Sequence, residues 1–257
     1  ICNVKYKPNV KEEIVRDHDH YTGEYKGSAH KTCNSKFCYE KSLNVFFHNL
    51  KGYDSHFLIQ EIGKCNKKIC VIPNNTETFL SFNIDKVKFK DSYQFLMASL
   101  DSLTKNLVKK EIMENNPDVL KNLSSEFKDE QLQLWKRKGI FPYDYLDSFD
   151  KFNETSLPNK KMFYYRLYND NVSQEDYDHA INIWNKFNMK TFGDYHDIYL
   201  KTDVLLLADI FKNFRKLCLS YYKLDPVHYY GTPGIAWDAC LKMSGQWLEL
   251  ITDPDKY

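Results

Sequence analysis

Residues 199–211 read Tyr-Leu-Lys-Thr-Asp-Val-Leu-Leu-Leu-Ala-Asp-Ile-Phe, and this stretch bears on both the fold and the site. Its apolar residues recur with the period of an α-helix, within a helix that we expect from about residue 194 to 222. Tyr199, Asp203 and Leu206 share one face, so the carboxylate has apolar neighbours. A buried carboxylate is costly unless it is satisfied, and a divalent cation satisfies it well. The stretch therefore predicts a metal-binding carboxylate on a long helix.

The composition is that of a folded chain without a strong overall charge. The 257 residues include 19 Tyr and 17 Phe, and the formal net charge is +1. This length suits one large domain and a small module. No apolar run approaches a membrane span, so we expect no membrane partner, and seven scattered cysteines favour a reducing, intracellular compartment. Because the chain opens with Ile1 rather than Met, we expect a fragment cut at both ends.

Patterns along the rest of the chain predict an α/β fold. A His/Cys-bearing, turn-rich module occupies 1–40. The expected strands lie at 44–48, 69–73, 78–83 and 86–91, the last three as a meander. The expected helices lie at 54–62, 99–108, 125–137 and from Ser173, with a loop-rich region at 140–172. We expect a mixed sheet flanked by helices over 41–225, with carboxylates at strand and helix ends as in ribonuclease-H-like nucleases.

A second carboxylate, Asp54, follows the first strand of that sheet. In the segment Phe46-Phe-His-Asn-Leu-Lys-Gly-Tyr-Asp54 a strand ends, the backbone turns at a glycine, and an acid begins a helix. Metal-dependent cleavage of phosphodiesters needs carboxylates from separate elements around ions about 3.5–4 Å apart. Asp54 and Asp203 can supply two ligands for Mg²⁺ or Mn²⁺, and Tyr199 can orient the attacking water. Taken alone, the segment is better explained as a turn with an Asp cap.

These residues together resemble the proofreading exonuclease of family-B DNA polymerases. Asn49-x-x-x-Tyr53-Asp54 and Tyr199-x-x-x-Asp203 look like its second and third motifs. Each short motif is weak, but two more follow the family's order. Ser99-Leu100 resembles the element that binds single-stranded DNA in the protein-primed subgroup, and Lys138-Gly-Ile-Phe resembles the Lys-x-x-hydrophobic element whose lysine assists exonucleolysis. The resemblance implies a single-stranded primer end, held also by Asn49 and Tyr53, and a template as partners, with a terminal protein as primer.

Longer stretches are similar to the polymerases of Polinton (Maverick) mobile elements. They are residues 47–56, 141–145, 193–197 and 230–240. For a eukaryotic element this implies replication in the nucleus, and it makes 226–257 the start of the connection to the polymerase palm. The family's first exonuclease motif, Asp-x-Glu, would precede residue 41 and is missing, and the palm carboxylates would lie beyond Tyr257. We therefore expect the parent protein, rather than this fragment, to polymerise and proofread.

The first 40 residues carry a dense set of metal ligands around a glycine-punctuated hairpin. Cys2, His30 and Cys33 can hold a structural Zn²⁺, the last two with the x-x spacing that such sites use. A zinc site needs a fourth ligand, which we expect to be a cysteine just upstream of Ile1. The alternative is that this segment is a solvated loop that binds no metal.

The same segment is similar to the His-Me finger nucleases, recombination endonuclease VII in particular. This resemblance implies that Asp17 and Asn34 bind one Mg²⁺ and that His18 activates water, with His20 a weaker candidate. Neutral imidazole suits a general base near pH 7. A zinc-stapled remnant that only shapes its surroundings is the alternative.

Three hypotheses follow from the sequence. The first is a fragment of a protein-primed family-B DNA polymerase that covers the exonuclease domain. The second is a stand-alone His-Me finger endonuclease. The third is a DNA-binding relic without catalysis, which would bind single strands with a steep salt dependence and cleave nothing.

Overall fold

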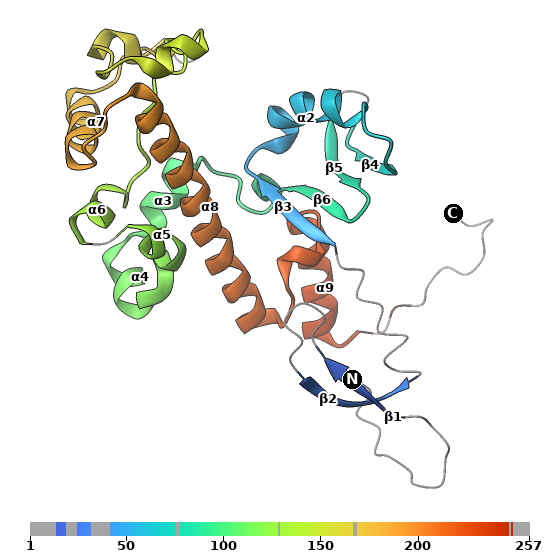
Figure 1. Cartoon of the computed structure of the whole chain (residues 1–257). Coiled ribbons are helices and arrows are strands. Elements are labelled where there is room, and N and C mark those ends of the chain that lie inside the picture. Colours follow the sequence, from blue (N-terminus) through green and yellow to red (C-terminus); the bar gives the residue numbers. More distant parts are fainter. Residues whose placement is uncertain are drawn as a thin grey trace, which may run out of the picture.

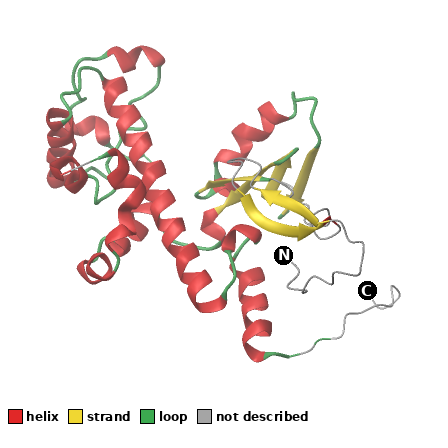
Figure 2. Ribbon diagram, turned by 60° about the horizontal axis from the view of Figure 1, so that its bottom comes forward, coloured by secondary structure: helices red, strands yellow, loops and turns green. Residues whose placement is uncertain are grey.

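The structure, a computed structural model, describes residues 14–18, 25–31, 42–75, 78–127, 129–166, 169–246 and 248. One long helix, α8 (Phe192–Tyr222), runs through the molecule (Figure 1). Helices pack on one side of it and a small sheet lies on the other, an arrangement that the turned view of Figure 2 also shows. The site predicted from the sequence therefore lies where these two parts meet along α8.

The sheet is mixed, as the sequence predicted. It contains β3 (Leu43–Phe47), β4 (Ile69–Pro73), β5 (Phe79–Ile84) and β6 (Val87–Asp91) in the order β3-β6-β5-β4. The last three strands form the expected antiparallel meander, whereas β3 pairs with β6 in parallel. The carboxyl ends of β3 and β6 therefore lie side by side at one end of the sheet, and the loop that leads to Asp54 starts there.

Helix α2 (Asp54–Ile62) covers one face of the sheet. Leu50, Ile62 and Phe82 form the buried centre of this layer. The side chains alternate along β5 and β6, so Phe82 and Phe89 face α2 while the neighbouring positions face the other way. A mixed sheet with helical layers is compatible with the ribonuclease-H-like fold expected from the sequence.

The helical part packs along α8 from its N-terminus as far as Asn213. Its helices are α3 (Leu100–Leu107), α4 (Lys110–Asn115), α5 (Lys121–Glu126), α6 (Asp129–Leu134) and α7 (Gln174–Lys186). Trp135, Phe141, Phe192 and Tyr195 are the large aromatic side chains of its core. As predicted, Ser173 caps α7 and the region 140–172 is rich in loops, where the described residues form short 3-10 helices and an isolated bridge between Tyr165 and Asp170.

Two expectations for this part were wrong. The helix expected at 125–137 is only the short α6, because Trp135 turns into the core and the chain after it crosses toward α8. Helices α4 and α5 have no counterpart in the prediction. The long helix expected from about 194 to 222 is present as α8, which begins at Phe192. Thr191 caps it by accepting a hydrogen bond from the Asp194 amide, and the Asp194 carboxylate accepts one from the Thr191 amide.

The segment that leads into helix α9 (Thr232–Ser244) is attached to the sheet through a buried lysine, Lys90 of β6. The ammonium donates to the Val227 carbonyl oxygen at 2.5 Å and lies 5.1 Å from the centre of the Tyr230 ring. Burial lowers the pKa of Lys90 to about 8, and the nearby charge of Lys88 acts in the same direction. The charged form of Lys90 is therefore less favourable in the folded protein than in the unfolded chain.

This shift predicts an unusual dependence of stability on pH. Because the pKa of Lys90 falls from 10.5 to about 8 on folding, the cost of burying its charge is fully present below pH 8 and disappears as the pH rises toward 10.5. Relative to Lys90→Met, the wild-type free energy of unfolding should rise by about 3 kcal/mol across this range. Urea denaturation of the wild type and of Lys90→Met at both ends of this pH range measures the rise. As a control, the difference in free energy of unfolding between the wild type and Lys190→Met, a change at an exposed position, should stay constant across the range.

Candidate active site

Asp203 lies half-buried on α8 with its two carboxylate oxygens in different surroundings. Oδ2 forms an ion pair with the Lys138 ammonium at 3.0 Å, and both side chains are largely covered, at 27% exposure for Lys138 and 19% for Asp203. Oδ1 is buried and has no hydrogen-bond partner. Burial raises the pKa of Asp203, and the positive charge of Lys138 acts against that rise. An unsatisfied buried carboxylate oxygen costs free energy and is available to a further cation.

Tyr199, one turn before Asp203, belongs to an aromatic cluster. Its hydroxyl is 2.7 Å from the hydroxyl of Tyr143, and its ring stacks on Phe141 with the ring centres 5.1 Å apart. A Cβ atom on Gly139 would come within 3.3 Å of the Tyr199 ring, so the close packing here needs glycine. Burial raises the pKa of Tyr199 far above its usual value, which keeps the hydroxyl protonated. It can therefore donate a hydrogen bond at neutral pH.

Tyr143 was not among the predicted site residues. It is 57% exposed, and its hydroxyl is bound to that of Tyr199. The sequence did contain a signal, because the stretch 141–145 is similar to the polymerases of Polinton elements and starts at the last residue of the Lys-x-x-hydrophobic element. Nothing in the sequence, however, pairs this tyrosine with a residue 56 positions away on another element.

The loop that leads to Asp54 is held in place by Asp91, at the end of β6. The Asp91 carboxylate is 1% exposed and accepts hydrogen bonds from the backbone amides of Asn49 at 2.9 Å and Lys51 at 3.3 Å. Asn49 has a left-handed backbone, with φ 67°, and its side chain lies over Gly52, where a Cβ atom would come within 2.7 Å of Oδ1. Burial raises the pKa of Asp54, and the negative charge of Asp91 acts in the same direction.

Asp91 is a second residue that the sequence prediction missed. The available signal was Lys90-Asp91-Ser92 at the end of a predicted strand. Its importance depends on β6 being parallel to β3, which puts the carboxylate beside the loop after Phe47. Ser92 supports the same corner, because its hydroxyl donates to the Phe47 carbonyl and lies 3.1 Å from Nδ1 of His48.

Ser99 and Leu100 stand at the start of α3. The Ser99 hydroxyl accepts a hydrogen bond from the Ser102 amide at 3.2 Å, so it is the N-cap of the helix. Leu100 packs against the main core. Both residues also line the hollow described next, so each of them stabilises the fold and is also part of the candidate site.

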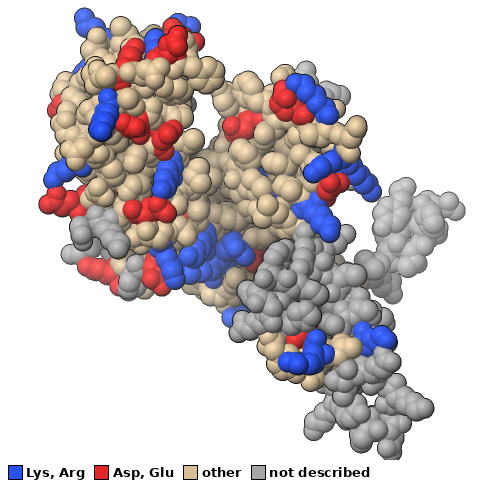
Figure 3. Space-filling view, viewed as in Figure 1, with Lys and Arg blue, Asp and Glu red and all other residues tan. Residues whose placement is uncertain are grey.

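A hollow of about 860 Å³ brings several predicted residues together. Those that line it are Tyr53, Ser99, Leu100, Lys138 and Tyr199, with Tyr143, Arg137 and Arg166 among their new neighbours. Asn49, Asp54 and Asp203 do not line it. In the sequence, however, Asp54 directly follows Tyr53 and Asp203 comes one helical turn after Tyr199, and both tyrosines do line the hollow. Figure 3 shows Lys and Arg side chains gathered over the lower, C-terminal half of α8.

The two predicted metal ligands are not joined in one cluster. The electrostatic neighbour of Asp54 is Asp91, whereas that of Asp203 is Lys138. Within the part of the chain that the structure describes, no group of three or more His, Cys, Asp or Glu side chains is arranged to hold a metal ion. Mg²⁺ commonly takes one or two carboxylates, with waters and substrate phosphates as its other ligands. The open Oδ1 of Asp203 fits such a site.

Part of the N-terminal module is described. The expected hairpin is present, as β1 (Ile14–His18) paired antiparallel with β2 (Tyr25–His30), and it carries Asp17 and His30. Cys2, His20, Cys33 and Asn34 lie outside the described residues, as does the side chain of His18. The zinc and magnesium sites predicted for this module therefore stay predictions.

These features define an α/β protein whose hollow beside α8 is lined by aromatic side chains and by charged side chains of both signs. The sequence profile described as "DNA polymerase type B, organellar and viral" matches residues 34–239, which is more than half of the chain. The chain belongs to this family. It is also similar to a DNA polymerase of Kluyveromyces lactis, with 27% identity over 187 residues.

The match to the yeast protein covers 68% of this chain but only 16% of that polymerase. The chain thus spans about a sixth of its curated relative. No solved structure matches it. Among the described residues, none of the helices combines the length and apolar character that crossing a membrane requires.

Proposed function

We propose that this chain is the 3′–5′ exonuclease region of a protein-primed family-B DNA polymerase, and that the hollow beside α8 holds the single-stranded end of a primer. The observation that carries the proposal is the convergence of Tyr53, Lys138 and Tyr199 on that hollow from three separate segments. Aromatic rings stack on bases of any sequence, and ammonium groups attract phosphates. A proofreading site must accept any sequence, and this combination does so.

Asp203 and Asp54 are the residues that would hold Mg²⁺ or Mn²⁺. The unpartnered Oδ1 of Asp203 supports its assignment, because Lys138 occupies only Oδ2. Asp54 is supported by its position at the start of α2, directly after Tyr53, which borders the hollow. Such an ion, when bound, lowers the pKa of a water and neutralises developing negative charge on the phosphate.

Lys138 and Tyr199 would act on the substrate from the wall of the hollow. The Lys138 ammonium lies 5.7 Å from the centre of the Tyr199 ring, so one residue offers positive charge and the other a hydroxyl at nearly the same place. The Tyr199 hydroxyl is 2.7 Å from the Tyr143 hydroxyl, a hydrogen bond in which either group can be the donor. This arrangement can orient a water and a phosphate without reading the base.

The finer identity is part of the same proposal. The full-length protein would copy DNA in replication, with a template strand and a terminal protein as its partners. It would belong to a Polinton-type element that replicates in the nucleus. The support is the family match together with the resemblance of 47–56 and 230–240 to those polymerases.

Binding of single-stranded DNA by this chain tests the proposal. Tyr53 is 66% exposed at the hollow, so Tyr53→Ala should weaken binding of an oligothymidine about 10-fold, as expected for one lost stacking contact. Fluorescence anisotropy measures the affinity. Phe149→Ala is the matched control, because that ring is 86% exposed but lies away from the hollow. Equal affinities for wild type and Tyr53→Ala, or an equal loss in both variants, would contradict the assignment.

The hairpin supports a second candidate activity, a His-Me finger endonuclease. Its pairing shifts register between Asp17 and His18, the residues to which the resemblance gives the roles of metal ligand and general base. Cleavage of duplex or branched DNA that is lost in His18→Ala but kept in Asp203→Ala would assign this activity to the hairpin. Binding without any Mg²⁺-dependent cleavage would instead favour the relic.

A further inference from the structure

The basic side chains that line the hollow beside α8 differ in how they are partnered. Three of the four form ion pairs with carboxylates of the protein. These pairs are Lys105 with Asp101 at 2.8 Å, Lys138 with Asp203 at 3.0 Å, and Arg137 with Asp176 and Glu175. The fourth, Arg166, is exposed, and its guanidinium forms no ion pair within the part of the chain that the structure describes. The charge of Arg166 is therefore available to a ligand.

The backbone around Arg166 is held by hydrogen bonds on both sides. The Arg166 amide donates to Oδ2 of Asp144 at 3.0 Å, and the Arg166 carbonyl accepts from the Asn169 amide at 3.3 Å. The preceding residue, Tyr165, forms an isolated antiparallel bridge with Asp170, in which the Tyr165 amide donates at 2.9 Å. Both polar backbone groups of Arg166 are thus bonded, and its side chain starts from a defined position at the hollow.

Arg166 is connected to the proposed exonuclease residues by successive contacts along one wall. The hydroxyl of Tyr199 is 2.7 Å from that of Tyr143, and the next residue, Asp144, accepts from the Arg166 amide. Tyr143, Asp144 and Arg166 all line the hollow. Its volume of about 860 Å³ is near the upper end of the usual range for ligand sites, roughly 300–1,000 Å³. The hollow therefore has room for more than the nucleotide at Tyr199.

The chemistry of a guanidinium favours a phosphate as its ligand. Arg is always charged in proteins, and its planar fork of donors matches two oxygens of a phosphate. In the proposed reaction, Asp203 and Lys138 act at the phosphate of the cleaved bond. Because digestion starts at the 3′ end, every other phosphate of the strand lies on the 5′ side of that bond. A phosphate that reaches Arg166 is therefore one of these.

We propose that Arg166 binds a backbone phosphate of the primer strand on the 5′ side of the cleaved bond. The released mononucleotide keeps only the phosphate of that bond, so Arg166 holds the strand but not the product. This contact reads no base, as proofreading of any sequence requires. The inference rests on the proposed function, because it needs the 3′ end of the strand to lie at Tyr199.

The test measures binding of an oligothymidine of about six nucleotides, labelled at its 5′ end, by fluorescence anisotropy. Arg166→Gln removes the charge, and Arg166→Lys keeps it. Neither change removes a described hydrogen bond of the fold, because those of Arg166 use its backbone. Circular dichroism melting checks that both variants are folded.

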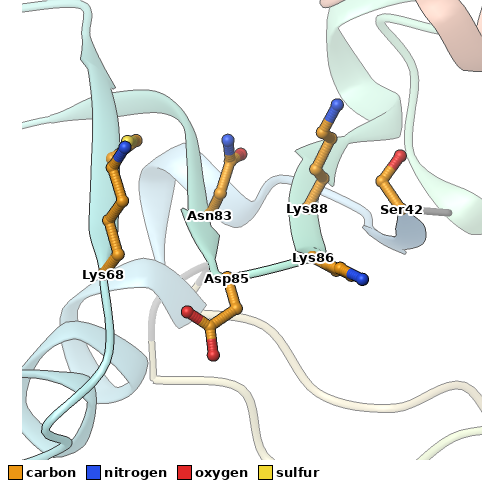
Figure 4. A pocket seen from close by; sticks show the side chains of 7 residues that line it. Ser42, Lys68, Asn83, Asp85, Lys86 and Lys88 are labelled. Carbon is orange, nitrogen blue, oxygen red and sulfur yellow. The ribbon is translucent and has the colours of Figure 1, made fainter. Parts of the chain in front are cut away.

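Lys68 supplies the matched control. It is exposed, and it lines a second hollow of about 230 Å³ at the turn before β6, beside Lys86 and Lys88 (Figure 4). This turn is at the opposite end of β6 from Asp91 and the loop that leads to Asp54. None of the described residues that line the second hollow is aromatic. Lys68→Gln therefore removes one positive charge from a hollow to which we assign no DNA.

Arg166→Gln should bind the oligothymidine about 5-fold more weakly than the wild type does. The slope of log affinity against log salt should fall by roughly 0.7, the share of one phosphate contact on a single strand. Arg166→Lys should keep the wild-type slope because it keeps the charge, and Lys68→Gln should match the wild type in affinity and slope. Equal affinities for the wild type and Arg166→Gln, or an equal loss in Arg166→Gln and Lys68→Gln, would overturn the inference.

The position of the contact is found by making one phosphate at a time neutral, as a methylphosphonate. At one linkage on the 5′ side of the last, this change should weaken binding by the wild type about 5-fold and leave Arg166→Gln unaffected, as a double-mutant cycle requires of a direct contact. At the 3′-terminal linkage both proteins should lose the same factor. Coupling to Arg166 at the 3′-terminal linkage, or at no linkage, would contradict the assignment.

These results separate the inference from the proposed function. If Tyr53→Ala weakens binding and Arg166→Gln does not, the hollow still holds DNA and only the role of Arg166 is wrong. If Arg166→Gln weakens binding and Tyr53→Ala does not, Arg166 stands and the stacking role of Tyr53 is wrong. If the wild type does not bind the oligothymidine, the proposed function fails, and the inference fails with it.

Discussion

Replacing Asp203 by asparagine should reduce 3′–5′ digestion of single-stranded DNA by the parent polymerase on the order of 10³-fold while primer extension continues. Asparagine keeps the shape of the side chain but removes the negative charge at Oδ1, the buried oxygen without a partner. A cation that is held by one or two carboxylates loses a principal ligand. Asp54→Asn should have an effect of the same order, because two-metal chemistry needs both acids.

The control comes from the same helix. Asp197 has 83% of its side chain exposed, so Asp197→Asn changes the same charge on α8 without touching the hollow and should leave digestion unchanged. Shortening of a single strand that is labelled at its 5′ end measures digestion, and extension of a primed template is followed in parallel. Wild-type digestion by either Asp203→Asn or Asp54→Asn would refute the metal assignment.

The same prediction carries a pH dependence with a definite sign. Burial raises the pKa of Asp203 above its usual value, so its ionised form should be lost at a higher pH than for an exposed aspartate. Digestion should therefore decline earlier on acidification. The positive charge of Lys138 lowers the pKa of Asp203, so Lys138→Gln should move the acidic limb of the pH–rate profile to still higher pH. If Lys138 only contacts a phosphate of the substrate, Lys138→Gln should lower the rate without moving that limb.

Replacing Asp209 by alanine should lower the free energy of unfolding by about 4 kcal/mol, the largest effect on stability that we expect from one polar side chain here. Asp209 is on α8 and fully buried, and its two oxygens accept hydrogen bonds from the backbone amides of Asn122 and Leu123 at 2.9 Å each. These amides open α5, which has no side-chain cap of its own. A carboxylate on one helix thus caps another.

The size of the effect follows from what alanine leaves behind. Two buried amides would lose charge-assisted hydrogen bonds worth roughly 1.5–3 kcal/mol each. Urea denaturation measures the loss, and Asp197→Ala, exposed on the same helix, should change stability by less than about 0.5 kcal/mol. A loss below about 1 kcal/mol for Asp209→Ala would mean that water replaces the carboxylate and that α5 does not depend on α8 for its cap.

Asp203 and Asp209 show how far the sequence reaches. Both stand in one apolar helical stretch, and the period of 3.6 correctly places Asp203 beside Tyr199 and Asp209 on another face. The prediction could not tell that Asp209 would face the start of α5, since α5 itself was not predicted. Local signals for α5 are weak because its N-terminus is completed by a residue 86 positions away.

The sheet shows the same division. The polar connectors at 74–75 and 83–85 indicated the meander, and the observed strands lie within one residue of the expected ones. The sequences of β3 and β6 do not indicate that these two strands pair in parallel. That pairing gives Asp91 its place beside the loop that leads to Asp54.

By itself, the sequence determined the periods of the helices and strands, the turns between them, and the short motifs that mark Asp54, Lys138, Tyr199 and Asp203, because these depend on neighbours within a few positions. Only the tertiary structure decided which of those residues share a hollow, which oxygen of Asp203 stays open, and that Tyr143 and Asp91 support the site. Such choices depend on contacts between residues far apart in the chain, where burial and chain geometry rather than local preference set the outcome.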